Sequence, residues 1–272
     1  VRQLKRQLDD LHSLPANCCF VNYLRCHDDI GWGLNEEFGR TIGIDPVAHK
    51  KYLYEFFEGS FPGSYARGER YNYNPATQDA RTCGTTASLC GIEKGLCEED
   101  ESQVALGIQR DLMMHAAMMT MAGFPMLSSG DEIGQLNGYD YHDDPDRRED
   151  SRNLHRTRFN WDNAARRKEP GTVQQRIWDG LRQLENIRCG EPCFGPEAWV
   201  TTWDTANRQV LALVRRTEGE TLVGLFNFSG DIQNIHMDAL EGNFTDLITG
   251  ETGPCTHRQL GPYQYCLCRQ SR

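Results

Sequence analysis

Apolar residues at the start of the chain follow a helical spacing. They recur every three or four positions over residues 1–11, and Pro15 follows where a helix should have ended. Residues 18–26 then form a compact apolar run that leads directly into His27-Asp28-Asp29. The pattern predicts a short helix and then a buried strand with polar residues at its C-terminal end.

Capping residues mark the next helix. Asp45 is a favoured N-cap, Pro46 suits the first helical position, and Gly59 would end the helix. The segment that follows, residues 61–81, mixes Gly, Pro and Asn with tyrosines and arginines, and it is too polar and broken for a core element. We interpret it as a functional excursion from the main fold.

The longest helical pattern of the chain runs from Ser102 to Ala122 and is closed by Gly123. A second strand is predicted over residues 124–128, and apolar positions at helical spacing predict another helix over residues 173–187. Helices therefore alternate with strands in the first two thirds, which is typical of the α/β class.

The pattern changes near Ala198. From there the chain consists of short alternating segments, such as WVTTWD, QVLALVRR and TLVGLFNF, separated by Gly, Asn and Asp turns. This spacing predicts a separate all-β antiparallel domain.

Composition limits the classes of partner. No apolar run approaches the roughly 18 residues of a membrane span, and the formal net charge of −10 disfavours a phosphate backbone. We therefore expect no membrane and no nucleic-acid partner, and a neutral small-molecule substrate suits the charge balance better.

The beginning of the chain and its cysteines bear on location. The first residue is Val1 rather than Met, and residues 1–11 lack the apolar core and cleavage site of a signal peptide. The 11 cysteines are odd in number and widely spread, unlike the framework of a small secreted domain. We expect a chain that starts within a longer protein, reduced thiols and a cytoplasmic location.

Cysteine spacing also raises the question of a metal. Cys83, Cys90 and Cys97 are seven residues apart, and Cys189 and Cys193 are four apart, so in helices each set would share one face. No C-x-x-C pair occurs, and buried, small apolar cysteines are the better interpretation. We expect no metal and no cofactor.

The run His27-Asp28-Asp29 is the leading candidate for chemistry, because active sites of α/β barrels form at the C-terminal ends of strands. Consecutive strand residues point to opposite sides, so Asp28 and Asp29 should have different roles. The alternative is that both carboxylates cap the next turn and pair with surface lysines.

Two further groups are candidates. Asp150-Ser151-Arg152 ends a dense charge run, in a loop that the same geometry would place over the same face. Asp79 and Arg81, with the tyrosines of the excursion, offer the hydrogen bonds and aromatic faces that suit sugars. Solvated surface and plain loop structure are the alternative interpretations.

Four segments together carry a resemblance to a known family. In this order and at similar spacing, the chain resembles amylosucrase, a sucrose-acting enzyme of glycoside hydrolase family 13 in the α-amylase superfamily, in the runs VNYLRCHDDIGWG, GSYARGERYNYNPATQDAR, GFPMLSSGDEIGQLN and EDSRNLHRTRFNW. The resemblance covers the chain from about Cys19 onward. The HDD and DSR runs are fairly specific to that group, whereas the GDE segment is common to the whole superfamily.

The resemblance implies the C-terminal portion of a (β/α)8 TIM barrel followed by an all-β antiparallel sandwich. Residues 1–29 would hold a barrel helix and the seventh strand, and residues 30–97 an inserted loop subdomain. Residues 98–195 would hold a barrel helix, the eighth strand, a long loop and the last helix, and residues 196–272 the sandwich. The missing N-terminal part of the same barrel would be the chain's partner.

The resemblance also implies site roles. Asp28 would stabilise the transition state by hydrogen bonds to sugar hydroxyls, and His27 would bind the same sugar. Asp29 and Arg152 would form an ion pair that closes the pocket, and Asp79 and Arg81 would contact the fructosyl or acceptor side. The nucleophile and the acid/base would lie on absent strands, so we expect these residues alone to be inactive.

The implied activity is a retaining transfer of glucose from sucrose to an α-1,4-glucan, with release of fructose. Two alternatives stay open: an α-glucosidase or sucrose hydrolase of the same superfamily, and a glucan-binding remnant without chemistry. Because unpaired barrel strands would expose apolar edges, we expect the isolated chain to be poorly soluble or to associate.

Overall fold

The computed structural model describes residues 2–11, 15, 18–237, 240 and 242–270. The chain divides into two compact units, residues 1–23, 112–126 and 179–272 in the first and residues 24–111 and 127–178 in the second. Two of the four boundaries fall inside long helices, α6 (Glu101–Thr120) and α8 (Val173–Gly190), and the other two lie between residues 23 and 24 and between residues 126 and 127.

The first unit opens with α1 (Arg2–Leu11), as the helical spacing predicts, and it contains a pair of short parallel strands. These are β1 (Val21–Asn22) and β4 (Phe124–Pro125), joined in register with Val21 beside Phe124. Both strands are shorter than predicted. Beyond Asn22 the chain leaves the pairing and bends, and Arg25 turns inward to bind backbone carbonyls instead.

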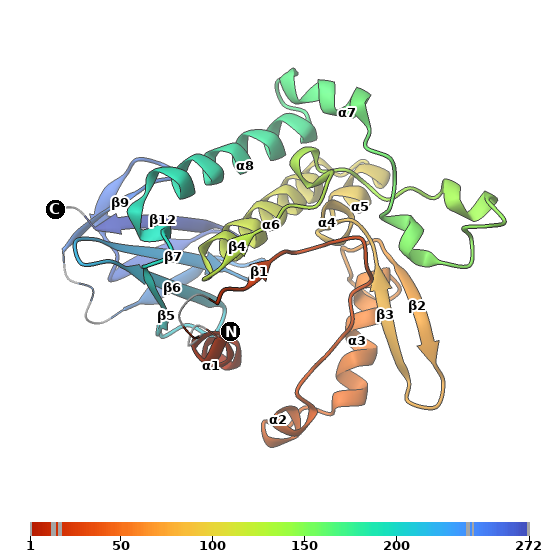
Figure 1. Cartoon of the computed structure of the whole chain (residues 1–272), viewed down its shortest axis with the longest axis horizontal. Helices are drawn as coiled ribbons and strands as arrows, with labels where there is room; N and C mark the ends of the chain where they lie inside the picture. The colour runs from red at the N-terminus through yellow and green to blue at the C-terminus, as the bar shows by residue number, and fades with distance from the viewer. Residues whose placement is uncertain (1, 12–14, 16–17, 238–239, 241, 271–272) are drawn as a thin grey trace. The chain divides into compact units, whose positions relative to one another are not determined.

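The C-terminal β domain, also in the first unit, forms as predicted around an antiparallel sheet of six strands, in the order β10-β9-β12-β7-β6-β5 (Figure 1). Strands β8 and β11 pair separately as a two-stranded antiparallel sheet. The remaining elements of this unit are η5 (Pro192–Phe194), β5 (Trp199–Trp203), β6 (Val210–Arg216), β7 (Thr221–Asn227), β8 (Gln233–His236), β9 (Asn243–Asp246), β10 (Thr252–Pro254), β11 (His257–Leu260) and β12 (Tyr265–Gln270).

Residues of both sheets build the core of this domain. Val210, Leu225 and Phe244 come from the six-stranded sheet, and Ile235 and Leu260 come from the two-stranded sheet; all five are buried in one cluster. β6 and β7 are apolar and buried along nearly their whole length, as strands covered on both faces are.

The second unit contains a hairpin of β2 (Glu69–Asn74) and β3 (Asp79–Cys83), with β3 packed against α3 (Pro46–Glu58) (Figure 1). Its other elements are α2 (Glu36–Thr41), α4 (Thr86–Leu89), α5 (Ile92–Cys97), η1 (Asp131–Ile133), η2 (Asp140–Asp143), η3 (Ser151–Leu154), α7 (Trp161–Ala165) and η4 (Arg166–Lys168).

Helix α3 begins and ends at the capping residues that the sequence predicts. The Asp45 carboxylate accepts hydrogen bonds from the backbone N–H groups of Val47 and Ala48, Pro46 is the first helical residue, and Gly59 closes the helix at φ 95°. A second glycine, Gly68, lets the hairpin approach this helix, because an added Cβ would lie 2.5 Å from the Cys83 carbonyl oxygen and 2.6 Å from that of Phe57.

The structure corrects the idea that regularly spaced cysteines share helix faces. Cys83 ends a strand, Cys90 caps α4 and Cys97 ends α5, so the spacing of seven spans three elements. Cys189 lies in α8 and Cys193 in η5. Burial is confirmed for six cysteines: Cys83, Cys90, Cys193, Cys255, Cys266 and Cys268.

Among the described residues, no helix combines the length and apolar character needed to cross a membrane.

Candidate functional site

A buried arginine shapes the bend that follows β1. Arg25 is 6% exposed. Its Nε donates to the carbonyl oxygen of Gly84 at 2.8 Å, and its Nη2 donates to the carbonyl oxygen of Asp28 at 2.8 Å. Each bond fixes a stretch of backbone, so Arg25 sets where the chain presents residues 27–29.

Asp28 is the most accessible carboxylate of the run, with a side chain 51% exposed. Its Oδ1 accepts from the backbone N–H of Asp29 at 2.9 Å and from Arg152 Nη1 at 3.4 Å. The Asp29 N–H is the larger cause, and with Arg152 it lowers the pKa of Asp28 to about 2. The result is an acceptor that is ionised above about pH 2 and that solvent can reach.

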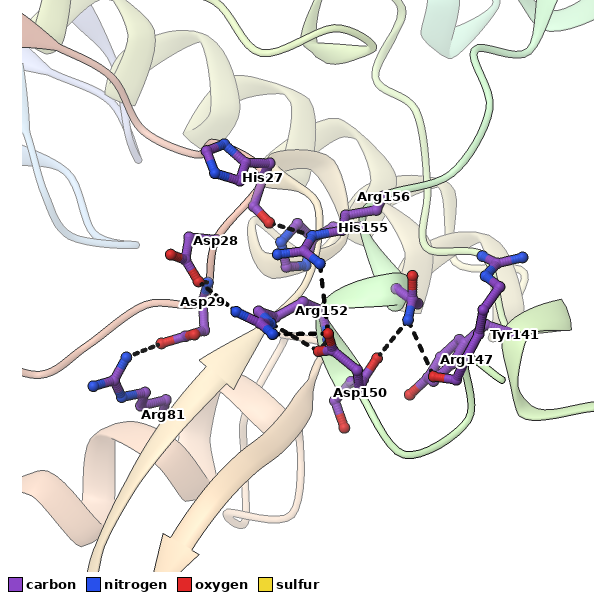
Figure 2. A network of polar contacts seen from close by, with 12 residues as sticks. His27, Asp28, Asp29, Arg81, Tyr141, Arg147, Asp150, Arg152, His155 and Arg156 are labelled. Atoms are coloured by element: carbon purple, nitrogen blue, oxygen red, sulfur yellow. Dashed lines mark hydrogen bonds and ion pairs between the residues drawn. The ribbon is translucent and has the colours of Figure 1, made fainter. Parts of the chain in front are cut away.

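Arg152 lies on η3 and is held by its own loop (Figure 2). Its Nε and Nη2 each donate to one oxygen of Asp150, both at 2.8 Å, and the guanidinium lies over the Tyr71 ring at 5.2 Å. The bidentate pair with Asp150 is the main cause of a raised pKa for Arg152. Arg152 therefore offers a fixed positive charge to Asp28.

Asp29 turns away from Asp28 and pairs with Arg81. Its Oδ2 lies 3.0 Å from Arg81 Nη1, with the Asp29 side chain 2% exposed and that of Arg81 56% exposed. The expected pair of Asp29 with Arg152 is therefore wrong. Ile30 and Thr82 exchange two backbone hydrogen bonds as an antiparallel bridge, which puts Asp29 and Arg81 in diagonal positions on one face.

One more residue that follows the DSR run, Arg156, binds the main chain of this bend. Arg156 Nε donates to the carbonyl oxygen of His27 at 2.5 Å, and its Nη1 lies 3.5 Å from Asp150 Oδ2. The His27 ring itself is exposed. The loop therefore grips the main chain of His27 and leaves its side chain accessible.

His155 is a half-buried imidazole within this arrangement. Gly84 N–H donates to its Nδ1 at 3.3 Å, and Arg25 Nη2 lies 3.3 Å from its Nε2. Burial, followed by the charges of Arg25 and Arg156, lowers the pKa of His155 to about 4. Because donors face both ring nitrogens, a second proton on the ring would have an unfavourable environment.

Asp79 lies apart from this group. It is on β3 with Arg81, but its ion pair is with Lys50, whose Nζ is 3.3 Å from Asp79 Oδ2 and 3.0 Å from Glu36 Oε1. The structure thus joins five of the six predicted residues into one network, which we call the Asp28 cluster: His27, Asp28, Asp29, Arg81 and Arg152, with Asp150, Arg25, His155 and Arg156 supporting them (Figure 2).

The supporting residues Arg25, His155 and Arg156 were missed as site residues. One signal was available for Arg25, because an arginine inside an apolar run needs buried partners. His155 and Arg156 follow the DSR motif directly, but their role depends on contacts about 130 residues away in sequence, with His27 and Arg25.

A polar pocket of about 650 Å³ adjoins the cluster through Arg156. Hydroxyl-rich ligands suit such a surface, because side-chain amides both donate and accept hydrogen bonds and guanidinium groups donate several. The lining includes Gln135, Asn137, Asn153, Asn160, Asn163, Arg147 and Arg158.

No family model matches the sequence. Solved structures do resemble the fold, and they are enzymes of glycoside hydrolase family 13, the α-amylase family. Among them are AmyP in complex with maltose (TM-score 0.52, 20% identity) and a substituted form of AmyP in complex with maltotriose (TM-score 0.51, 20% identity), each covering 61% of this chain and 35% of the other.

A third similar structure is the trehalulose synthase MutB from Pseudomonas mesoacidophila MX-45, with a TM-score of 0.47, 20% identity, and coverage of 60% of this chain and 38% of the other. The chain thus spans little more than a third of the length of these structures. At this identity the similarity shows the fold of the matched part, and the AmyP matches carry it.

Proposed function

We propose that this chain is the C-terminal part of an amylosucrase-like retaining transglucosidase, which takes glucose from sucrose, releases fructose and transfers the glucosyl group to an α-1,4-glucan. The proposal rests on the resemblance of the HDD and DSR runs and on one observation of the structure. Asp28 is an exposed, ionised carboxylate that Arg25 and Arg152 hold in a defined position.

Such a carboxylate fits the role of a transition-state stabiliser. Retaining enzymes use a nucleophile and an acid/base about 5 Å apart, and hydrogen bonds to sugar hydroxyls strengthen as positive charge develops on the ring. Asp28 would accept those hydrogen bonds, with the exposed His27 ring beside it. The nucleophile and the acid/base would come from the rest of the barrel, outside these 272 residues.

The ion pair of Asp29 with Arg81 takes the place of the expected pair with Arg152. In this proposal the pair closes the pocket. The Arg81 guanidinium and the Asp29 carboxylate are hydrogen-bonded to each other, so neither group needs a sugar hydroxyl as its partner. Arg152 instead orients Asp28. Asp79, held by Lys50, would contribute to the acceptor side.

Exposed apolar side chains support a longer barrel. Around the parallel pair of β1 and β4 they are large and only partly covered: Phe20 40%, Val21 56%, Tyr23 50%, Phe124 65% and Met126 41% exposed. A monomer rarely leaves such groups in water together, and neighbouring barrel strands with their helices would cover them. The missing part of the barrel would therefore be the partner of this surface.

Sugar binding to the 272-residue chain tests the role of Asp28 directly. We expect calorimetry with maltose to show binding that Asp28→Asn weakens by about tenfold or more, because a hydrogen bond to a charged group is lost. Asp204→Asn is the matched control, since Asp204 is an 89% exposed aspartate paired with Lys5. Equal affinity of wild type and Asp28→Asn would contradict the proposed site.

The activity itself is tested on the longer protein. We expect the reading frame to continue upstream of Val1 and to supply an aspartate after a fourth strand and a glutamate after a fifth. The complete enzyme should lengthen glucan when it is given sucrose. Glucose and fructose as the only products would identify a sucrose hydrolase, and glucan binding insensitive to Asp28→Asn with no turnover would identify a binding remnant.

A further inference from the structure

The core of the C-terminal β domain contains a buried group of sulfur and oxygen donors. Cys266 and Cys268 are two residues apart on β12, so their side chains share one face. Asp246 on β9 stands directly opposite Cys268 in the strand pairing. One carboxylate oxygen and the two sulfur atoms all lie within 4.8 Å of one another.

A third thiol is buried in the same core. Cys255 lies between β10 and β11 and is fully buried. The three cysteines are 2% exposed or less, and Asp246 is 3% exposed. The three grouped donors come from the neighbouring strands β9 and β12.

We propose that Asp246, Cys266 and Cys268 bind one soft divalent metal ion such as Zn²⁺. Buried zinc sites in proteins are rich in thiolate ligands, and thiolates favour Zn²⁺ over the harder Mg²⁺ and Ca²⁺. The ion would join the neighbouring strands β9 and β12 inside the six-stranded sheet.

Charge balance favours an ion at this place. Arg258 Nη1 lies 2.9 Å from Cys268 Sγ and 3.5 Å from Asp246 Oδ2. With the metal bound, its two charges and that of Arg258 match the two thiolates and the Asp246 carboxylate. A neutral buried group is the least costly arrangement.

The two thiolates in this charge balance predict that protons are released when the metal binds. Cysteine binds a metal ion as the thiolate and not as the thiol. Each ion that binds must then displace two protons, one from each thiol, as the two metal–sulfur bonds form.

Cobalt and cadmium titrations of the reduced 272-residue chain test the site. We expect one ion per chain, a thiolate-to-metal charge-transfer band, release of two protons per ion in weak buffer, and a higher melting temperature. Cys266→Ala and Asp246→Asn should each weaken binding at least tenfold. Cys193→Ala is the matched control, because it removes an equally buried thiol on η5 and should leave binding unchanged.

A second control excludes a competing surface site. The exposed side chains of His236 and His257 lie next to each other across β8 and β11, with their Nδ1 atoms 3.1 Å apart. A histidine pair binds metal without a thiolate band. His257→Gln should leave the band intact. The proposal fails if no band forms, if Cys266→Ala retains it, or if mass spectrometry shows two of these three cysteines joined as a disulfide in the unreduced protein. Should Asp246→Asn not melt cooperatively, the folded Cys266→Ala variant decides.

Discussion

In the C-terminal β domain, cohesion comes from apolar side chains that two antiparallel sheets bury between them, with Phe244 and Leu225 at the centre. In the Asp28 cluster it comes from guanidinium groups that bind backbone carbonyls and carboxylates along irregular chain. Apolar packing tolerates exchange among side chains of similar volume. Polar bracing depends on particular donors, so the second region is where single changes should alter binding more than stability.

The largest loss of stability should come from the apolar region. Phe244→Ala removes a fully buried ring of the β-domain core and should lower the free energy of unfolding by about 3–5 kcal/mol. Chemical denaturation would measure it, with the exposed Trp199→Ala as the control. A loss below about 1 kcal/mol would show that the ring is not essential to this core.

Substitution of Arg25 should lower both the stability of the chain and its affinity for maltose. Arg25→Met keeps the apolar stem but leaves the carbonyl oxygens of Gly84 and Asp28 without their donor, which should cost about 1–3 kcal/mol. Maltose affinity should fall as well, because the bend is no longer fixed. Arg25→Lys should restore little of either, since an ammonium cannot reproduce two forked N–H donors. Full rescue by lysine would argue against the bracing role.

His155 should make the stability of the chain depend on pH. Its folded-state pKa is lowered to about 4, from an ordinary value of 6.5, so the unfolded chain binds more protons between those values. Stability should therefore fall as pH drops from about 6.5 to 4, by about 2 kcal/mol after allowance for solvent screening. In His155→Gln, the melting temperature should depend less on pH over that range. An unchanged dependence would contradict a half-buried His155 that is neutral in the folded state.

The smallest effect on stability should belong to Asp28. Its half-exposed carboxylate is ionised down to about pH 2 because Asp29 N–H and Arg152 bind it, and its contribution is present above about pH 4 and lost toward pH 2. Asp28→Asn should leave the melting temperature at pH 7 almost unchanged. Carbon NMR titration of the Asp28 carboxyl would measure the pKa, and an ordinary value would remove the argument for a held anion.

The elements that sequence predicted well are those with local signals. The helix from Pro46 to Glu58 follows from Asp45 and Gly59, which act within a few residues. The β domain follows from alternation along each strand. The different directions of Asp28 and Asp29 also follow from local geometry, and the structure gives the two carboxylates different partners.

The predictions that were wrong concern contacts between residues far apart in the sequence. Asp29 meets Arg81 because Ile30 forms a bridge with Thr82, and nothing within the HDD run encodes that bridge. The predicted strand over residues 18–26 is interrupted because Arg25 finds its acceptors at Gly84 and Asp28. Likewise, equal spacing among cysteines carries no information once each lies in a different element.

Arg25 holds residue 28 by its carbonyl oxygen, and every amino acid has one. The shape of the bend therefore depends on Arg25, whereas the charge that the bend presents depends on the side chain at position 28. A gene could lose the acid through a single codon change and still encode the same bend. A substitution at position 28 would change the charge that the bend presents and leave the hydrogen bond from Arg25 to the carbonyl oxygen in place.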